Sequence, residues 1–550
     1  MKRTNLIILV GLLSFFMGSC NYLEYTETSY LHKENIFSDW NRTQSFLSDI
    51  YATLPLGFVP VGGAMRASAT DDAEFVLDYS SVQKFNDGSW SAIQTLDDQW
   101  ANFYSGIRAV NLFLEGVKGR KFEDYKWTDT YTDEMTQFNN YPHEARFLRA
   151  FFYLQLIERY GNVPLVTTVL TEDEANGVSP ANYDDIVSYI VSECDAIIPL
   201  LPVTYVGFTS AQETGRATRG AAMALKARTL LYAASPLHNP SGTAQKWIDA
   251  AKAAKDIMNT TTYTLEANYN AFLNSVASKE LILERREGNQ NYFEKANFPI
   301  GYEGGNTGNC PTQNLVDAYE MKANGLNISD PNSGYNPADP YTGRDPRFAL
   351  TILYNTSTFK SKQLECWTGG SNAAPKTNAT KTGYYLKKYV IESISLDPSS
   401  ISSKQHTWVL FRYGEVLLNY AESMNEAYGP ENASTLGMTA LQAVNLIRTR
   451  AKMPLFPAGL TKDQFRSKLQ NERRVEMAFE EQRFWDIRRW KIGNTTKEIY
   501  GMEITKNVDG TYKYTKKLVE TRVFEDKMNL YPIPLSELYK NSKLKQNTGW

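Results

Sequence analysis

Apolar residues recur at three- and four-residue steps over most of the chain, and this spacing predicts helices. Residues 97–117 carry one apolar stripe, and residues 144–166 carry a broader one. Gly161 and Pro164 are signals that end the second of these helices. Residues 182–202 continue with the same period and close on prolines. The N-terminal half therefore begins with a helix, a turn and a helix.

The same arrangement returns further along the chain. Residues 216–235 precede residues 244–259, and residues 413–429 precede residues 440–454. Each pair has small residues where helices would touch, and the fragments "LLYAAS" and "LLNYAES" occupy matching places. Recurrent helix pairs are typical of tetratricopeptide-like repeats, here with irregular spacing. We therefore predict a mainly α fold of degenerate, interrupted helix pairs.

Two stretches lack this helical period. Residues 57–90 and 288–405 are rich in Gly, Asn, Pro, Ser and Thr, as in "GYEGGNTGNCPTQ". Such composition predicts ordered loops with short strands. Loops held on a rigid scaffold commonly carry binding sites. We expect these two regions to face one another.

The first residues have the pattern of an export signal. Two basic residues precede an apolar run, residues 6–17, which is followed by Gly18, Ser19 and Cys20. The run is shorter than the roughly 20 residues that span a bilayer. A cysteine directly after two small residues predicts a signal peptide at 1–19 and lipidation of Cys20. The alternative is an ordinary secreted chain cut nearby, with a free cysteine.

Composition narrows the class of partner. The formal net charge of −3 offers no basic field for phosphate backbones, so no nucleic acid is expected. After Cys20, three cysteines remain, Cys194, Cys310 and Cys366, and they allow at most one disulfide. Tyrosines (34) outnumber phenylalanines (26), which indicates that some rings line a half-hydrated surface.

Catalytic signatures are scarce in the sequence. The four histidines stand at no metal-ligand spacing, and neither a GxSxG motif nor a phosphate-binding loop occurs. Paired carboxylates of a glycoside hydrolase stay open, because they need only lie about 5 to 10 Å apart in space. Arginines of residues 471–490 alternate with acids, which predicts local ion pairs on one scaffold helix.

Calcium is the one cofactor for which the sequence offers ligands. Four hard oxygen donors lie close together in the loop-rich stretch: Asp330, Asn332, Asp339 and Asp345. Their spacing departs from that of an EF-hand, which favours solvated turns. We expect no cofactor, with a structural calcium ion as the alternative.

Six segments resemble, in this order, the SusD/RagB family of outer-membrane nutrient-binding lipoproteins: "EARFLRAFFYLQLIERYGNVPLV", "CPTQNLVDAYEMKANG", "YTGRDPRF", "FRYGEVLLNYAESMNEAYG", "ERRVEMAFEEQRFWDIRRW" and "YPIPLSELYKNSKLKQNTGW". The likeness covers essentially the whole chain after Cys20. It implies an N-terminal helical region at 20–235 and a C-terminal region at 236–550. The latter would hold a ligand-facing insert at 288–405 and a helical end at 411–550.

The resemblance also implies a function. Members of the family capture oligosaccharides, or in the RagB branch peptides, at the bacterial cell surface. They pass the ligand to a SusC-like TonB-dependent transporter in the outer membrane and are not enzymes. Oligosaccharide binding is our first hypothesis; binding of a peptide or another nutrient, and then a surface glycan hydrolase, are the alternatives. The sugar and its linkage stay open.

The family's motifs carry no ligand residues, so the site is predicted from chemistry. Sugar rings bind flat aromatic plates flanked by planar polar groups. The candidate plates in the two loop regions are Trp90, Tyr302 and Trp367, then Tyr79 and Tyr335. The candidate polar partners are Asp71, Asp72, Asn86 and Glu303. Trp367 ranks first because "CWTGGSNAAP" has little to bury it; for each ring, capping a hydrophobic edge is the alternative.

Overall fold

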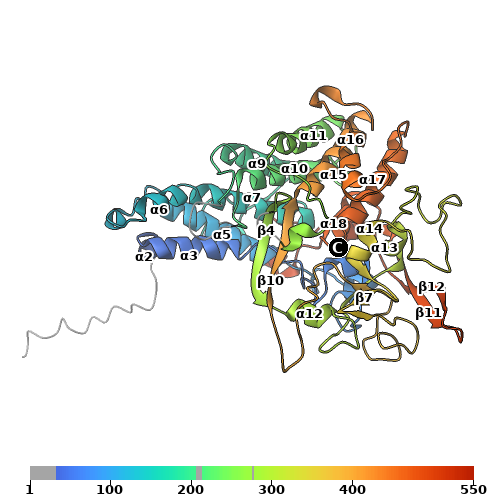
Figure 1. Ribbon diagram of the computed structural model, residues 1–550. Helices are drawn as coiled ribbons and strands as arrows, with labels where there is room; N and C mark the ends of the chain where they lie inside the picture. The colour runs from blue at the N-terminus through green and yellow to red at the C-terminus, as the bar shows by residue number, and fades with distance from the viewer. Residues whose placement is uncertain (1–32, 206–213, 275–277) are drawn as a thin grey trace, which may run out of the picture.

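A computed structural model describes residues 33–205, 214–274 and 278–550 of the chain. The predicted signal peptide and lipidated Cys20 lie outside the described residues. The chain is mainly helical, and its strands form small two-stranded sheets (Figure 1). The predicted fold class is therefore confirmed.

Nine long helices of the described residues form one continuous row. They are α3 (Trp40–Tyr51), α5 (Trp100–Val117), α7 (Tyr141–Tyr160), α9 (Tyr183–Ile197), α10 (Arg219–Ala234), α11 (Ala244–Asn259), α15 (Tyr413–Tyr428), α16 (Ala440–Arg450) and α17 (Lys462–Glu476). From α5 onward each packs on the next through α15, and α15 packs on both α16 and α17 (Figure 1). Because α15 packs on α11, residues 260–412 form an insertion in the row. Shorter helices accompany it: α2 (Lys33–Phe37), α4 (Gln83–Asp87), α6 (Tyr131–Phe138) and α8 (Glu172–Asn176).

Local signals set several helix ends. Helix α7 stops at Gly161, whose φ of 71° is the left-handed conformation that glycine adopts without strain. The helix therefore ends at Gly161, as the sequence predicted, and the following β2 (Val163–Pro164) pairs with β3 (Pro180–Ala181). At the start of α10, the Thr218 hydroxyl accepts a hydrogen bond from the backbone N–H of Ala221.

The prediction of a single helix over residues 471–490 is wrong. Helix α17 ends at Glu476, and α18 (Gln482–Arg489) begins after a break in which Phe479 and Glu481 have φ of 61° and 64°. Arg489 does bind Asp486 three residues earlier, but Arg473 reaches the same carboxylate across the break. The break directs these arginines to buried carboxylates, so most pairing is not local.

The insertion leaves and rejoins the helices through an antiparallel ribbon, β4 (Leu281–Gln290) with β10 (Lys404–Arg412). Short elements joined by loops lie between these strands. They are α12 (Tyr292–Asn297), β5 (Asn309–Pro311), α13 (Gln313–Ala318), α14 (Pro346–Thr351), β6 (Ile352–Leu353), β7 (Thr358–Phe359), β8 (Lys362–Gln363) and β9 (Tyr385–Leu386). This agrees with the predicted ordered loops and short strands.

The N-terminal loop does face the insertion, as predicted. Strand β1 (Ala73–Phe75) pairs antiparallel with β5. Beside this pair, the backbone N–H of Met65 donates to Asn309 Oδ1 at 3.0 Å, and the Thr312 hydroxyl donates to the Asp71 carbonyl at 2.6 Å. Segments far apart in sequence thus form one loop-rich layer.

The C-terminal end is not purely helical, contrary to the prediction for 411–550. After α18 the chain forms a hairpin of β11 (Glu498–Lys506) and β12 (Tyr512–Thr521), and then the short helix α19 (Leu535–Lys540). The hairpin lies beside α13 in the loop-rich layer (Figure 1). Alternation in "YKYTKK" and the turn "NVDG" favour strands here.

Buried ion pairs tie the insertion to the helices. Arg412 at the end of β10 binds Glu280, Glu476 and Glu480 at 2.8, 2.8 and 2.7 Å. Arg347 of α14 also binds Glu476, at 2.9 Å. All five side chains are buried, so removing one partner would leave an uncompensated charge in the core.

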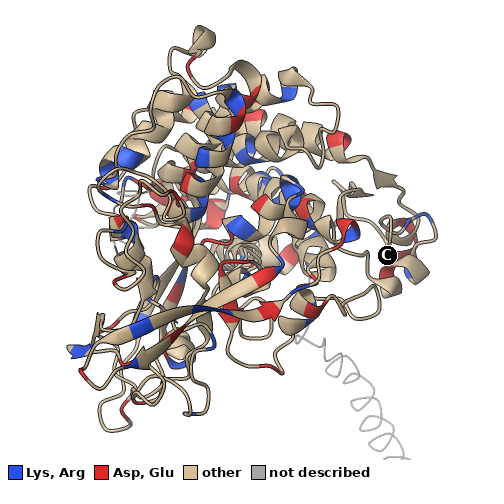
Figure 2. Cartoon of the chain, turned by 90° about the vertical axis from the view of Figure 1, so that its right-hand side faces the viewer, with Lys and Arg blue, Asp and Glu red and all other residues tan. Residues whose placement is uncertain are grey.

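Charges elsewhere are mixed, and lysines and arginines alternate with acids over the helices and loops in the view of Figure 2. Cys194, Cys310 and Cys366 are buried free thiols, so no pair of them is disulfide-bonded. In the described ranges, no helix has both the length and the apolar character needed to cross a membrane.

Candidate ligand-binding site

Six half-buried aromatic residues of the loop-rich layer form what we call the loop face: Tyr302, Tyr341, Tyr354, Trp367, Tyr512 and Tyr514. The Tyr341 ring centroid lies 4.6 Å from that of Tyr354 and 5.3 Å from that of Tyr514. Burial raises the pKa of Tyr302, Tyr341 and Tyr514, and the thiol of Cys366, next to Trp367, adds to the shift in all three. Half-buried rings of this kind pack on one side and offer polar edges on the other.

Trp367 is held by a turn and by the hairpin. Its carbonyl accepts a hydrogen bond from the Gly370 N–H at 2.7 Å, and the neighbouring Thr368 N–H donates to Ile504 of β11 at 2.9 Å. Lys506 Nζ lies 4.9 Å from the ring centroid. The expectation that little would bury this ring is thus corrected, because the hairpin covers part of it. The indole N–H has no hydrogen-bond partner in the described residues.

Tyr302 lies on a loop that is bonded to the Trp367 loop. The Asn372 side chain joins them: its Nδ2 donates to the Ile300 carbonyl at 2.6 Å, and its Oδ1 accepts from the Glu365 N–H at 3.0 Å. The Tyr302 hydroxyl donates to the Phe359 carbonyl at 2.9 Å. The predicted polar partner Glu303 is exposed beside it. Two of the predicted plates, Tyr302 and Trp367, therefore belong to one hydrogen-bonded set of loops.

A recess of about 830 Å³ lies near Tyr302, although Tyr302 itself does not line it. Glu392 lines it, accepts a hydrogen bond from the Lys360 N–H at 3.3 Å, and acts with burial to raise the pKa of Tyr302. Its walls come from the segment after β9, from both strands of the β4–β10 ribbon and from residues 270–273. Tyr389 in its wall adopts a left-handed φ of 69° and stacks on Trp408 at 5.1 Å. Such strain in a bulky residue is often found at functional sites.

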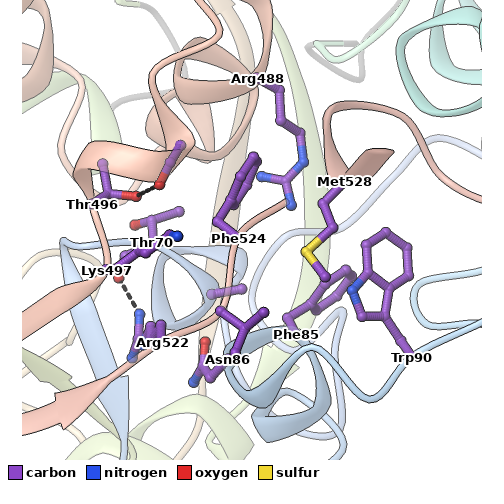
Figure 3. A pocket seen from close by; sticks show the side chains of 13 residues that line it. Thr70, Phe85, Asn86, Trp90, Arg488, Thr496, Lys497, Arg522, Phe524 and Met528 are labelled. Atoms are coloured by element: carbon purple, nitrogen blue, oxygen red, sulfur yellow. Dashed lines mark hydrogen bonds between the residues drawn. The ribbon is translucent and has the colours of Figure 1, made fainter. Parts of the chain in front are cut away.

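Trp90 is not on a surface. Only 3% of it is exposed, and its ring centroid lies 4.8, 5.3 and 4.5 Å from those of Phe85, Tyr531 and Trp550. Asn86 is also buried and donates to Ser68 and Gln83. Both side chains line a very small cavity beneath the loops, together with Arg488 and Met528 (Figure 3). Rings from the far end of the chain cover Trp90, so the prediction that it contacts a ligand does not fit this structure.

Asp71 and Asp72 are buried ion-pair partners. Arg483 binds Asp71 at 2.9 Å, and Arg474 binds Asp72 at 2.6 Å. Burial alone would raise the pKa of Asp71, but the two guanidinium groups outweigh it and lower this pKa to about 2. Burial and the neighbouring Asp71 raise the pKa of Asp72. These carboxylates join loop and helix, which leaves them unavailable as sugar partners.

The two second-ranked aromatic candidates, Tyr79 and Tyr335, differ in exposure. Tyr79 is 85% exposed, so little of its ring is held by packing. Tyr335 is half-buried, with the Arg344 guanidinium 5.5 Å from its centroid. Neither belongs to the loop face.

The four residues named as ligands for the alternative, a structural calcium ion, all bind protein groups in this structure. The buried Asp345 binds Arg347 at 2.7 Å and caps α14. The other three candidates, Asp330, Asn332 and Asp339, make hydrogen bonds within exposed turns. Across the described ranges, no three His, Cys, Asp or Glu side chains are grouped so that they could hold a metal ion. Turn chemistry explains the acidic loop.

Four tyrosines of the loop face were missed from the sequence: Tyr341, Tyr354, Tyr512 and Tyr514. The last two stand at alternate positions of β12, so the period-two pattern "YKY" was a usable signal. Tyr341 and Tyr354 lie in irregular loops, where spacing carries no information about which side chains meet.

The described residues thus combine a row of packed helices with a loop-rich layer that carries half-buried aromatic rings. The family model described as "SusD family" matches residues 257–550, and the model described as "Starch-binding associating with outer membrane" matches residues 59–231. The first match alone covers more than half of the chain. The chain therefore belongs to the SusD family, as its resemblance to SusD/RagB proteins predicted.

Individual relatives align over three quarters or more of the chain. SusD-like protein P25 of Formosa agariphila is 23% identical and aligns over 99% of this chain and 98% of its own; protein P2 of the same species is 25% identical over 76% and 75%. A SusD-like protein of Bacteroides fragilis superposes with a TM-score of 0.79 at 26% identity, covering 94% of this chain and 98% of its own. A SusD-like carbohydrate binding protein of that species superposes with a TM-score of 0.73 at 25% identity, over 93% and 100%.

Proposed function

We propose that this chain is a cell-surface binding lipoprotein that captures an oligosaccharide on its loop face. The observation that carries the proposal is the hydrogen-bonded set of loops that presents Trp367 and Tyr302, with a recess of about 830 Å³ near Tyr302. Aromatic rings next to a polar cavity suit sugars, which have apolar ring faces and polar edges. A related fold described as carbohydrate binding supports this assignment.

The proposal extends to location and partner. Cys20 carries the lipid that anchors the chain to the outer membrane, and the captured sugar passes to a SusC-like TonB-dependent transporter. The family model described as associating with the outer membrane supports the location. Binding without turnover is the proposed activity. Labelling with a radioactive fatty acid, compared with a Cys20→Ala variant, tests the anchor, and co-purification of a TonB-dependent barrel tests the partner.

The binding test compares two tryptophans. Purified chain is titrated with a panel of oligosaccharides by calorimetry, and Trp367→Ala is compared with Trp127→Ala. Trp127 is 85% exposed on the segment before α6 and lies outside the loop face, so the same chemical change serves as a control. We expect Trp367→Ala to weaken binding and Trp127→Ala to leave it unchanged, with both melting temperatures preserved. Equal affinity of all three proteins, or tight binding of peptides and no glycan, would reject the proposal.

A further inference from the structure

One wall of the recess near Tyr302 carries two polar side chains that the fold does not use for its own hydrogen bonds. Strands β4 and β10 place Asn289 and Gln405 directly opposite each other in the ribbon, and both side chains are exposed and line the recess. Neither amide makes a side-chain hydrogen bond in the part of the chain that the structure describes. An amide pair with free donors and acceptors can bind vicinal hydroxyl groups on a sugar.

Two ammonium groups add donors that pair with no carboxylate of the described residues. Lys387 Nζ donates to the Ala349 carbonyl at 3.0 Å, and Lys404 Nζ donates to the Ser393 hydroxyl at 2.8 Å. Both amines therefore keep donors for further acceptors, since an ammonium group has three. Two further nitrogen-bearing side chains line the recess, Lys388 and His406, and both are already bound to buried glutamates.

An apolar side completes the recess. Leu350 is an exposed leucine at its edge, and Val390 and Ile391 are half-buried along it. One apolar side and one side of amides and amines match the two faces of a chain of sugar rings. The volume lies in the upper part of the roughly 300–1,000 Å³ range of ligand pockets, so it has room for several sugar units.

Two hydrogen bonds connect the recess wall to Tyr302 of the loop face. The Tyr302 hydroxyl is bound to the carbonyl of Phe359, and the next residue, Lys360, donates its N–H to Glu392 in the recess wall. Tyr302 and Glu392 are therefore held by two neighbouring residues of one loop.

We propose that the recess is a second binding subsite and that the protein's ligand is an extended oligosaccharide, which spans the loop face and the recess together. This inference rests on the proposed function and specifies the length of the ligand. A mono- or disaccharide would reach the loop face and leave the recess empty. The longer chain gains the amide and amine contacts, so affinity rises with length until both subsites are filled.

A length series tests the subsite. The sugar retained best in the panel is supplied as oligomers from two to eight units and titrated against the wild type, Trp367→Ala and the double variant Asn289→Ala/Gln405→Ala. We expect the double variant to lose about tenfold in affinity for the longest oligomer and less than about twofold for the shortest. Trp367→Ala is expected to weaken binding of every length.

The outcomes separate the two proposals. Equal losses at all lengths in the double variant, or no loss at any length, would overturn the second subsite while leaving the loop face intact. If Trp367→Ala changes binding of no oligomer, the proposed function itself fails. Because Asn289 and Gln405 are exposed, the double variant should keep the melting temperature of the wild type, and this comparison checks its folding. A crystal structure with the longest oligomer shows directly whether sugar fills the recess.

Discussion

The substitution Trp90→Ala tests whether the Trp90 ring stabilises the fold by packing or contacts the ligand. The ring is buried, and it contacts Phe85, Tyr531 and Trp550, the last two from the C-terminal end of the chain. Truncating a buried tryptophan to alanine typically costs about 3–5 kcal/mol, because the lost transfer energy adds to the cost of a cavity. The three ring contacts, each contributing about 0.5–1.5 kcal/mol beyond burial, favour the upper part of this range.

Urea denaturation followed by circular dichroism measures this loss, and glycan affinity is measured at low temperature on the folded fraction. Trp127→Ala is the matched control; since its ring is exposed, its free energy of unfolding should change by less than about 0.5 kcal/mol. We expect Trp90→Ala to be strongly destabilised yet to bind the glycan with wild-type affinity once folded. A variant that is as stable as the wild type and has lost glycan binding would refute the packing role and restore Trp90 as a ligand plate.

Three further changes test separate parts of the structure. Trp367→Ala should raise the dissociation constant for the preferred glycan about 3- to 10-fold in calorimetry, the worth of one ring contact, and an unchanged constant would remove Trp367 from the site. Burial raises the pKa of Glu158 from 4.5 to about 7, so the neutral form stabilises the fold at low pH and this contribution is lost as pH rises through 7. Glu158→Gln should therefore gain up to about 3 kcal/mol at pH 8 relative to pH 4 in urea denaturation, and an equal effect at both pH values would contradict the assignment. Arg412→Met leaves three buried glutamates without their shared partner and should cost about 3–5 kcal/mol, whereas a neutral effect would mean that the cluster does not hold the ribbon to the helices.

Helices were predictable where the information is local. The apolar period located α5 and α11 because each helix buries one stripe, and Gly161 ended α7 through its own backbone preference. The break between α17 and α18 gave no such signal. Phe479 and Glu481 adopt left-handed conformations there, and distant contacts such as the ion pair of Glu481 with Arg66 hold them.

The site was only partly predictable for the same reason. Trp367 and Tyr302 stood out because polar and small residues surround them in sequence, and both belong to the loop face. Trp90 has a similar sequence environment, but Tyr531 and Trp550 cover it from the opposite end of the chain. Asp71 and Asp72 likewise find Arg483 and Arg474 only through the fold. Composition identifies a residue suited to binding, whereas long-range packing decides whether a ligand can reach it.

A crystal structure with the best-retained oligosaccharide tests glycan capture most directly. The proposed site requires sugar density against the Trp367 ring and next to Tyr302, continuing toward Asn289 and Gln405. Sugar bound instead in the groove of about 660 Å³ lined by Trp247 and Trp490, or no bound sugar at saturating concentration, would contradict it.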